Sequence, residues 1–132
     1  MNSTLHAASA DGIVWIKMAM AYLMLGIVLG ITMGATENFT LRPVHAHINL
    51  IGWATMALAG VIYTVFPKAG ASPLARVHFW LYNLALPTMM VALAMVLMGK
   101  QDVIPLLAAS EILLAAGVLA FAANVFLNVK KP

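Results

Sequence analysis

The sequence contains no cysteine and very few charged residues. Of its 132 residues, 8 % are Asp, Glu, Lys or Arg, whereas 64 % are hydrophobic. The absence of cysteine excludes a disulfide framework and a thiolate metal site. A soluble domain carries roughly a quarter charged residues, because its surface faces water. The sparse charge therefore argues against a soluble domain, and the small formal net charge of +3 argues against a nucleic-acid-binding surface.

Long apolar runs fill most of the chain. A helix needs roughly 20 apolar residues to cross a hydrocarbon core of about 30 Å. Segments of this length occur at about 13–34, 44–66, 77–98 and 103–127. The linkers between them are short and contain turn-forming residues, so neighbouring helices are expected to be antiparallel. The sequence predicts an all-α membrane protein, with residues 1–132 forming a single four-helix transmembrane bundle.

The ends of the chain and its basic residues predict how the bundle is oriented. Residues 1–12 are polar and lack the basic start of a signal peptide, so the first apolar run is expected to be retained as a span. Basic residues concentrate on the cytoplasmic side of membrane proteins. The side with both termini carries Lys17, Lys68, Arg76, Lys130 and Lys131, and the other side carries Arg42 and Lys100. We therefore expect a multi-pass protein of a bacterial-type inner membrane, with both termini in the cytoplasm.

Two histidines, His45 and His47, stand at the expected outer end of the second span, in the stretch RPVHAHINLIGW. Helical residues two positions apart point about 200° away from each other, so these rings cannot easily bind one metal ion. They serve metal sites on two different flanks, or one binds a metal while the other lies among the lipid headgroups, or both simply lie at the membrane interface. His78 and His6 are expected near the inner side. A further ligand for the outer pair is therefore expected from another subunit, another residue type or solvent.

The segment from His47 to Pro67 resembles the second transmembrane helix of the catalytic subunit of heme–copper oxidases, and most closely that of the nitric oxide reductase branch. In that helix a histidine is followed by Asn-Leu, and a Gly-x-x-Tyr-x-x-x-Pro pattern closes the segment. The matching positions here are His47, Asn49, Leu50, Gly60, Tyr63 and Pro67. The family's histidine is an axial ligand of the low-spin heme, and the resemblance gives this role to His47. The pair His45 and His47 also resembles a His-x-His motif of a later helix, whose histidines bind two different hemes.

This resemblance implies a b-type heme protein for electron transfer or for sensing heme or a gas. The family's large subunit has twelve spans, arranged as three arcs of four helices, and this chain looks like one arc. The sequence shows no histidine pair or crosslinked tyrosine for a copper centre, which leaves enzymatic turnover open. A homo-oligomer, a trimer in preference to a dimer, would let His45 of one copy face His47 of the next across a heme. A separate electron-transfer partner is also open.

Polar residues near the histidines are further candidates for the site. Asn49 belongs to the resembling motif. Arg42, three residues before His45, can pair with a heme propionate or extend to the lipid headgroups. Glu111 is the only acid well inside a predicted span, where a carboxyl group is costly and marks a functional candidate. It is expected to hydrogen-bond a histidine, to carry a proton, or to lie neutral against Ser110.

Two alternatives to a heme protein stay open. Ten methionines accompany the histidines, and thioethers bind copper(I), so a copper-binding membrane protein is one alternative. A non-catalytic accessory subunit of a respiratory complex is the other. Elsewhere, Asn83 and Asn124 are expected to bond across helices. His78 and its aromatic neighbours are expected to form an aromatic belt at the inner interface.

Overall fold

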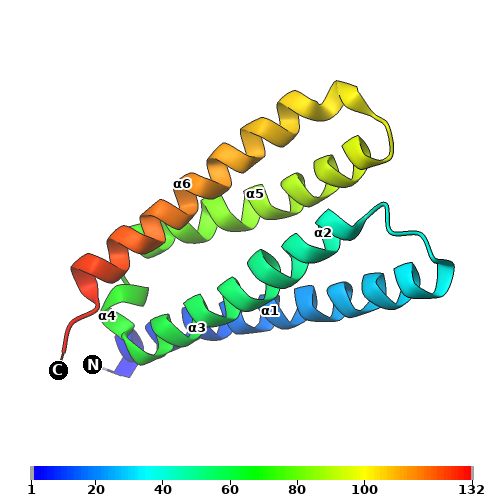
Figure 1. Cartoon of the computed structure of the whole chain (residues 1–132). Helices are drawn as coiled ribbons and strands as arrows, with labels where there is room; N and C mark the ends of the chain where they lie inside the picture. The colour runs from blue at the N-terminus through cyan, green and yellow to red at the C-terminus, as the bar shows by residue number, and fades with distance from the viewer. Residues whose placement is uncertain (1, 132) are drawn as a thin grey trace.

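The computed structural model describes residues 2–131, with side chains described from Gly12 onward, so that the side chain of His6 lies outside the described residues. The described chain is helical almost throughout (Figure 1). Its elements in order are α1 (Asn2–Thr36), α2 (Arg42–His47), the π-helical stretch η1 (Ile48–Thr55), α3 (Met56–Val65), α4 (Pro67–Gly70), α5 (Pro73–Leu97), the 3₁₀ turn η2 (Gln101–Val103) and α6 (Ile104–Asn128). The second long helix is thus one continuous rod made of α2, η1 and α3.

The four expected spans are confirmed as helices long and apolar enough to cross a membrane. They cover Gly12–Thr36, Arg42–Val65, Pro73–Leu97 and Gln101–Asn128. Their bounds differ from the apolar runs where local capping, rather than hydropathy, decides where a helix begins. The third helix begins four residues early, at Pro73, because the Ser72 hydroxyl accepts a hydrogen bond from the Ala75 amide at 3.1 Å. A serine cap followed by proline is a common helix start.

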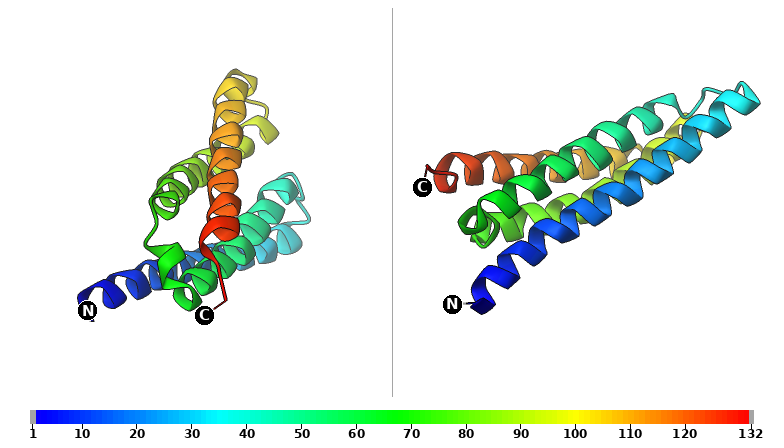
Figure 2. Two further views of the ribbon diagram at one scale, coloured as in Figure 1. Left: turned by 90° about the vertical axis from the view of Figure 1, so that its left-hand side faces the viewer. Right: turned by 90° about the horizontal axis from the view of Figure 1, so that it is seen from below.

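The helices form two antiparallel hairpins, α1 with the α2–α3 rod and α5 with α6 (Figures 1 and 2). Both termini and α4 lie at one end of the bundle, which we call the termini end. The loop of residues 37–41 and the α5–α6 turn lie at the opposite end, which we call the far end. The predicted antiparallel arrangement of neighbouring helices is confirmed.

A glycine makes the reversal between α5 and α6 possible. Gly99 has a φ of +98°, in the left-handed region that costs glycine little. The amides of Gly99 and Lys100 donate to the carbonyls of Val96 at 3.0 Å and Met95 at 2.9 Å. This is the pair of hydrogen bonds of a Schellman motif, which satisfies the last carbonyls of a helix.

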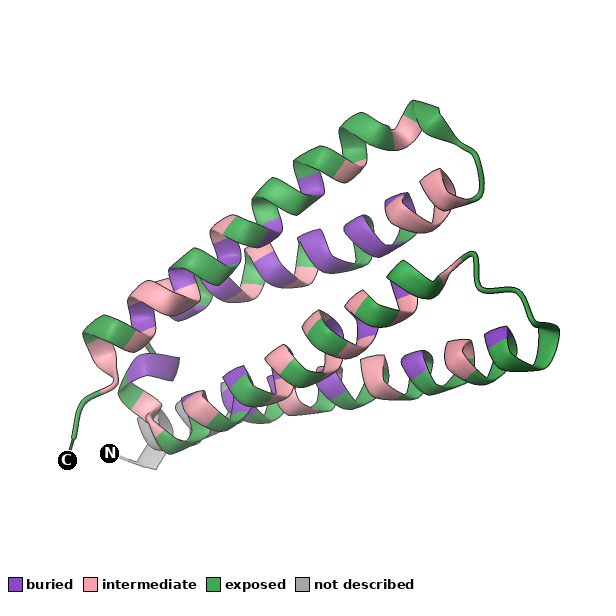
Figure 3. Ribbon diagram, in the orientation of Figure 1, coloured by how far each residue is buried: buried purple, intermediate pink, exposed green. Residues whose placement is uncertain are grey.

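Many large apolar side chains lie on the outer surface of the bundle, whereas aromatic and polar residues are among its largest fully buried side chains. Figure 3 shows how buried and exposed residues are distributed over the helices. Trp15, Tyr63 and Tyr82 are almost fully buried, whereas Phe126 is 86 % exposed and Ile112 is 69 % exposed. Exposing an apolar surface of this extent to water is unfavourable, whereas contact with the hydrocarbon chains of a membrane is favourable. The arrangement is that of a multi-pass membrane protein in contact with lipid.

Candidate functional site

His45 faces α1 of its own chain. It is half-buried, and a Cβ added at Gly30 would lie 2.9 Å from the Cε1 atom of its ring. Asn49 lies one turn further along the same flank, where it packs on Gly26. The Asn49 amide nitrogen donates to the His45 carbonyl at 3.0 Å and lies 3.2 Å from Nε2 of the ring. The two glycines, one turn apart on α1, therefore make room for side chains of the same protomer.

His47 lies on a different flank of α2, and only one of its ring nitrogens has a hydrogen-bond partner among the residues whose side chains are described. Its Nδ1 atom is 2.7 Å from the carbonyl oxygen of Pro43. A carbonyl can only accept a hydrogen bond, so Nδ1 carries the proton and donates it. In the neutral ring, Nε2 then keeps its lone pair. In metal sites, a hydrogen bond from the other ring nitrogen to a carbonyl oxygen orients the histidine ligand and fixes its tautomer in the same way.

The structure divides the four residues expected around a heme. His45 and Asn49 are hydrogen-bonded to each other and pack against α1. His47 and Arg42 form no hydrogen bond with either of them. Arg42 is exposed at the far end, and its guanidinium carbon lies 5.2 Å from the centre of the Phe39 ring. This cation–π contact keeps the guanidinium at the boundary of the apolar region.

The His47 imidazole could supply one axial ligand to a heme iron. Within the described residues, no three His, Asp or Glu side chains come together in a way that could hold a metal. A porphyrin supplies four of the iron's ligands itself, so a single oriented imidazole is enough for the protein's share. His47 is half-buried and close to the far end, where propionates can reach water.

Glu111 makes none of the contacts expected of it within the chain. The Ser110 hydroxyl donates to the Leu107 carbonyl at 2.8 Å, and Ser110 is buried. Glu111, the next residue, is rotated by about 100° on α6 and is exposed. It makes no hydrogen bond or ion pair with any residue whose side chain is described. Its expected hydrogen bond to a histidine is therefore not formed with His45, His47 or His78, the histidines whose side chains are described.

A second group of polar residues, near the termini end, was not predicted as a unit. We call Tyr63, Ser72, His78, Asn124 and Asn128 the inner polar cluster. The Tyr63 hydroxyl lies 2.8 Å from His78 Nδ1, and the Asn124 amide nitrogen lies 3.4 Å from the same hydroxyl. The Asn124 side-chain oxygen accepts from Ser72 at 2.9 Å and from Asn128 at 2.7 Å. These bonds join α3, α5 and α6, and the Asn124 bond to the Ala69 carbonyl at 3.0 Å adds α4.

His78 is enclosed by aromatic rings. It stacks between Trp15, at 4.4 Å between ring centres and 24° between planes, and Phe121, at 4.7 Å and 23°. The residue is 1 % exposed, and its Nε2 atom has no hydrogen-bond partner among the described residues. The expected aromatic belt at the interface is therefore wrong for His78 and Tyr82, which lie in the core, although Trp80 is exposed.

The two asparagines expected to bond across helices behave differently. Asn124 does so, as part of the inner polar cluster. The Asn83 amide nitrogen instead donates to the Phe79 carbonyl of its own helix at 2.9 Å, and its side-chain oxygen has no partner among the described residues. The sequence does not distinguish the two because the outcome depends on which neighbouring helix is within reach.

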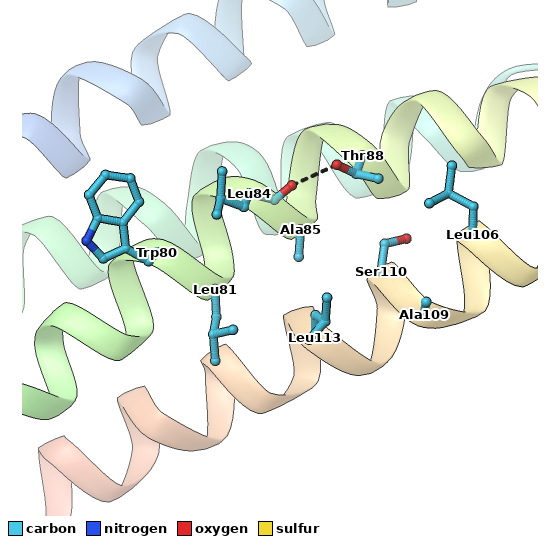
Figure 4. A pocket seen from close by; sticks show the side chains of 9 residues that line it. All are labelled: Trp80, Leu81, Leu84, Ala85, Thr88, Leu106, Ala109, Ser110 and Leu113. Carbon is cyan, nitrogen blue, oxygen red and sulfur yellow. Dashed lines mark hydrogen bonds between the residues drawn. The ribbon is translucent and has the colours of Figure 1, made fainter.

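A shallow groove between α5 and α6 is lined mostly by apolar side chains, with no charged side chain and no histidine among its lining residues (Figure 4). Its one polar side chain from α5, Thr88, donates to the Leu84 carbonyl of the same helix at 2.8 Å. The groove suits a lipid acyl chain. Its lining residues are Trp80, Leu81, Leu84, Ala85, Thr88, Leu106, Ala109, Ser110 and Leu113.

Comparison with known proteins gives no relative, since no protein-family model, curated protein or solved structure matches the chain.

Proposed function

We propose that the chain is a membrane-embedded b-type heme protein in which Nε2 of His47 binds the iron. The observation that carries the proposal is the 2.7 Å hydrogen bond between His47 Nδ1 and the Pro43 carbonyl. It fixes the ring in the tautomer whose unprotonated nitrogen, Nε2, is directed away from the backbone. The resemblance of the segment from His47 to Pro67 to a heme-binding helix supports the same residue.

Features around His47 support a heme in preference to copper. The π-helical stretch η1 begins at the next residue, and π-helical turns are frequent at functional sites. A porphyrin is flat and apolar and suits the lipid-facing flank of the bundle. Arg42, at the far end, would neutralise a propionate. Bound heme would supply a one-electron couple or a gas-binding iron, and the axial ligand would tune its potential.

The second axial ligand would come from another copy of the chain. A cyclic homo-oligomer, with a trimer preferred to a dimer, could present His45 of one copy to the heme of the next. His45 must leave its contacts with Gly30 and Asn49 to do so. His47 therefore carries the proposal, and a role for His45 stays a prediction.

Absorbance spectra of the detergent-purified protein, oxidised and reduced, test the proposal. We expect a Soret band, with sharp α and β bands on reduction if two imidazoles bind the iron. His47→Ala should abolish these bands. His45→Ala should keep the Soret band, and it should lose the sharp α band if His45 is the second ligand.

Two results would overturn the proposal. A His47→Ala protein that keeps its full heme spectrum would exclude His47 as the ligand. A colourless protein would exclude heme altogether. Among colourless outcomes, copper binding by the purified protein would support the copper alternative, and copurification with a large respiratory partner would support an accessory subunit.

A further inference from the structure

Four exposed basic side chains lie at the termini end of the bundle. They are Lys68 on α4, Arg76 in the first turn of α5, and Lys130 and Lys131 directly after α6. No ion pair joins any of them to a residue whose side chain the structure describes. All four carry a positive charge at neutral pH. We call these four residues the basic patch.

Three of the four acidic residues of the chain lie away from the basic patch. Glu37 and Asp102 are in the two connections at the far end, and Glu111 lies within the fourth span. The fourth acid, Asp11, has its side chain outside the described residues. Four positive charges therefore share the termini end with at most one carboxylate, which leaves a net positive charge for a partner.

A buried asparagine holds together the three segments that carry the basic patch. The amide nitrogen of Asn124, which is fully buried, donates to the Ala69 carbonyl of α4 at 3.0 Å. Its side-chain oxygen accepts from the Ser72 hydroxyl at 2.9 Å and from the Asn128 amide at 2.7 Å. The short helix α4, the start of α5 and the end of α6 are thus bonded to one side chain.

The basic residues lie close in the chain to the residues that Asn124 binds. Lys68 is next to the α4 carbonyl that accepts from Asn124, Arg76 is one helical turn after Ser72, and Lys130 is two positions after Asn128. These hydrogen bonds explain how charges from three segments, far apart in the sequence, come to one end of the bundle.

Exposed apolar side chains beside the basic patch indicate how deep it lies in the membrane. Val77 follows Arg76, Trp80 is one turn further along α5, and Leu127 lies three residues before Lys130; all three apolar residues are exposed. Exposed tryptophan is typical of the boundary between hydrocarbon and headgroups. Lysine and arginine side chains next to such a surface extend to the headgroups. The anions within their reach are lipid phosphates.

We infer that the basic patch binds the headgroups of anionic phospholipids in the leaflet at the termini end. The ammonium groups of the lysines donate to phosphate oxygens, and the Arg76 guanidinium can hold two oxygens of one phosphate. Basic residues at the ends of membrane helices attract anionic lipids in this way. The inference does not depend on heme, because His47 lies towards the opposite end of the bundle.

Native mass spectrometry of the full chain in detergent, with added phosphatidylglycerol or phosphatidylcholine, tests the inference. Both lipids carry a phosphate, but only phosphatidylglycerol has a net negative charge. We expect the protein to bind phosphatidylglycerol at least about ten-fold more tightly, and this preference to fall as the ammonium acetate concentration rises. The fourfold variant Lys68→Gln/Arg76→Gln/Lys130→Gln/Lys131→Gln should bind both lipids equally well.

Single variants provide the matched control. Arg76→Gln and Lys130→Gln should each weaken phosphatidylglycerol binding about five-fold, the effect of one basic residue near an anionic surface. Lys100→Gln removes one exposed basic residue at the far end and should change the affinity by less than about two-fold. All these substitutions are of exposed side chains, and an unchanged melting temperature in detergent shows that each variant is folded.

Four results would overturn the inference. The first is equal binding of the two lipids by the unsubstituted protein, and the second is a fourfold variant that keeps the preference. Displacement of bound phosphatidylglycerol by an equal concentration of inorganic phosphate would identify a site for a free anion, and displacement by polyglutamate would identify a site for an acidic protein. The absorbance spectrum reports on heme and the mass spectrum on lipid, so either proposal can fail without the other.

Discussion

Tyr63 donates a hydrogen bond to Nδ1 of His78 at 2.8 Å, and this bond joins α3 to α5 in the core of the bundle. The Asn124 amide nitrogen, which can only donate, approaches the same hydroxyl at 3.4 Å, so His78 Nδ1 is the only acceptor for the hydroxyl proton among the described residues. The hydroxyl therefore gives its own proton to His78. The bond stabilises the contact between the two hairpins, as does the Tyr82 hydroxyl, which donates to the Ile51 carbonyl at 2.6 Å.

Tyr63→Phe should destabilise the protein without changing the packing of the ring. It leaves His78 Nδ1 buried without a donor, which typically costs about 1–3 kcal/mol. Thermal unfolding in detergent measures the loss. Tyr22→Phe is the matched control, since Tyr22 is half-buried and makes no hydrogen bond with the described residues. Equal melting temperatures for the two variants would contradict the assigned role of Tyr63.

His78→Phe tests whether Tyr63 and His78 act as a pair. The new ring keeps the stack between Trp15 and Phe121 but removes the acceptor of the Tyr63 hydroxyl. The double variant Tyr63→Phe/His78→Phe should lose less unfolding free energy than the two single variants together, by about 0.5 kcal/mol or more. The reason is that both substitutions remove the same hydrogen bond. Additive losses of unfolding free energy in a double-mutant cycle would show that the two residues contribute independently.

Gly30→Ala should destabilise the contact between α1 and α2. The added methyl group would lie 2.9 Å from Cε1 at the end of the His45 ring, so the ring has to shift. Overpacking costs about 1–3 kcal/mol and offsets the gain of up to about 1 kcal/mol from helix propensity. Gly34→Ala, one turn later on α1, meets no atom within 4 Å and should gain up to about 1 kcal/mol from helix propensity. Thermal melts compare the two. A Gly30→Ala protein as stable as Gly34→Ala would show that His45 does not occupy this space.

Single cysteines placed at opposite ends of the bundle should show which end faces the cytoplasm. Gln101 and Ala71 are exposed at the far end and the termini end. If the excess of basic residues holds the termini in the cytoplasm, a membrane-impermeant maleimide added to intact cells should label Gln101→Cys and not Ala71→Cys. Labelling of both after lysis is the control. The reverse pattern in intact cells would place the termini outside.

The lengths of the apolar runs by themselves determined the number of membrane spans. The short linkers between these runs determined that neighbouring spans form antiparallel hairpins. Each run of about 20 apolar residues has to form a helix in lipid, because only a helix satisfies its own backbone there. The helix geometry also predicted that His45 and His47 would occupy different flanks. These properties depend on residues close together in the chain, and the sequence is sufficient to predict them.

The partners of the polar residues were decided only by the tertiary structure. Nothing near His78 in the sequence indicates that Tyr63 would bond to it, or that Asn124 would bond to Tyr63. Tyr63 and Asn124 are 15 and 46 positions away from His78, on other helices. Likewise, the sequence placed Glu111 inside a span, but only the packed bundle shows that it faces outward. An unpaired polar atom in hydrocarbon is costly, so polar side chains within spans favour hydrogen-bond partners. Which atoms come within hydrogen-bonding distance depends on how the helices pack against one another.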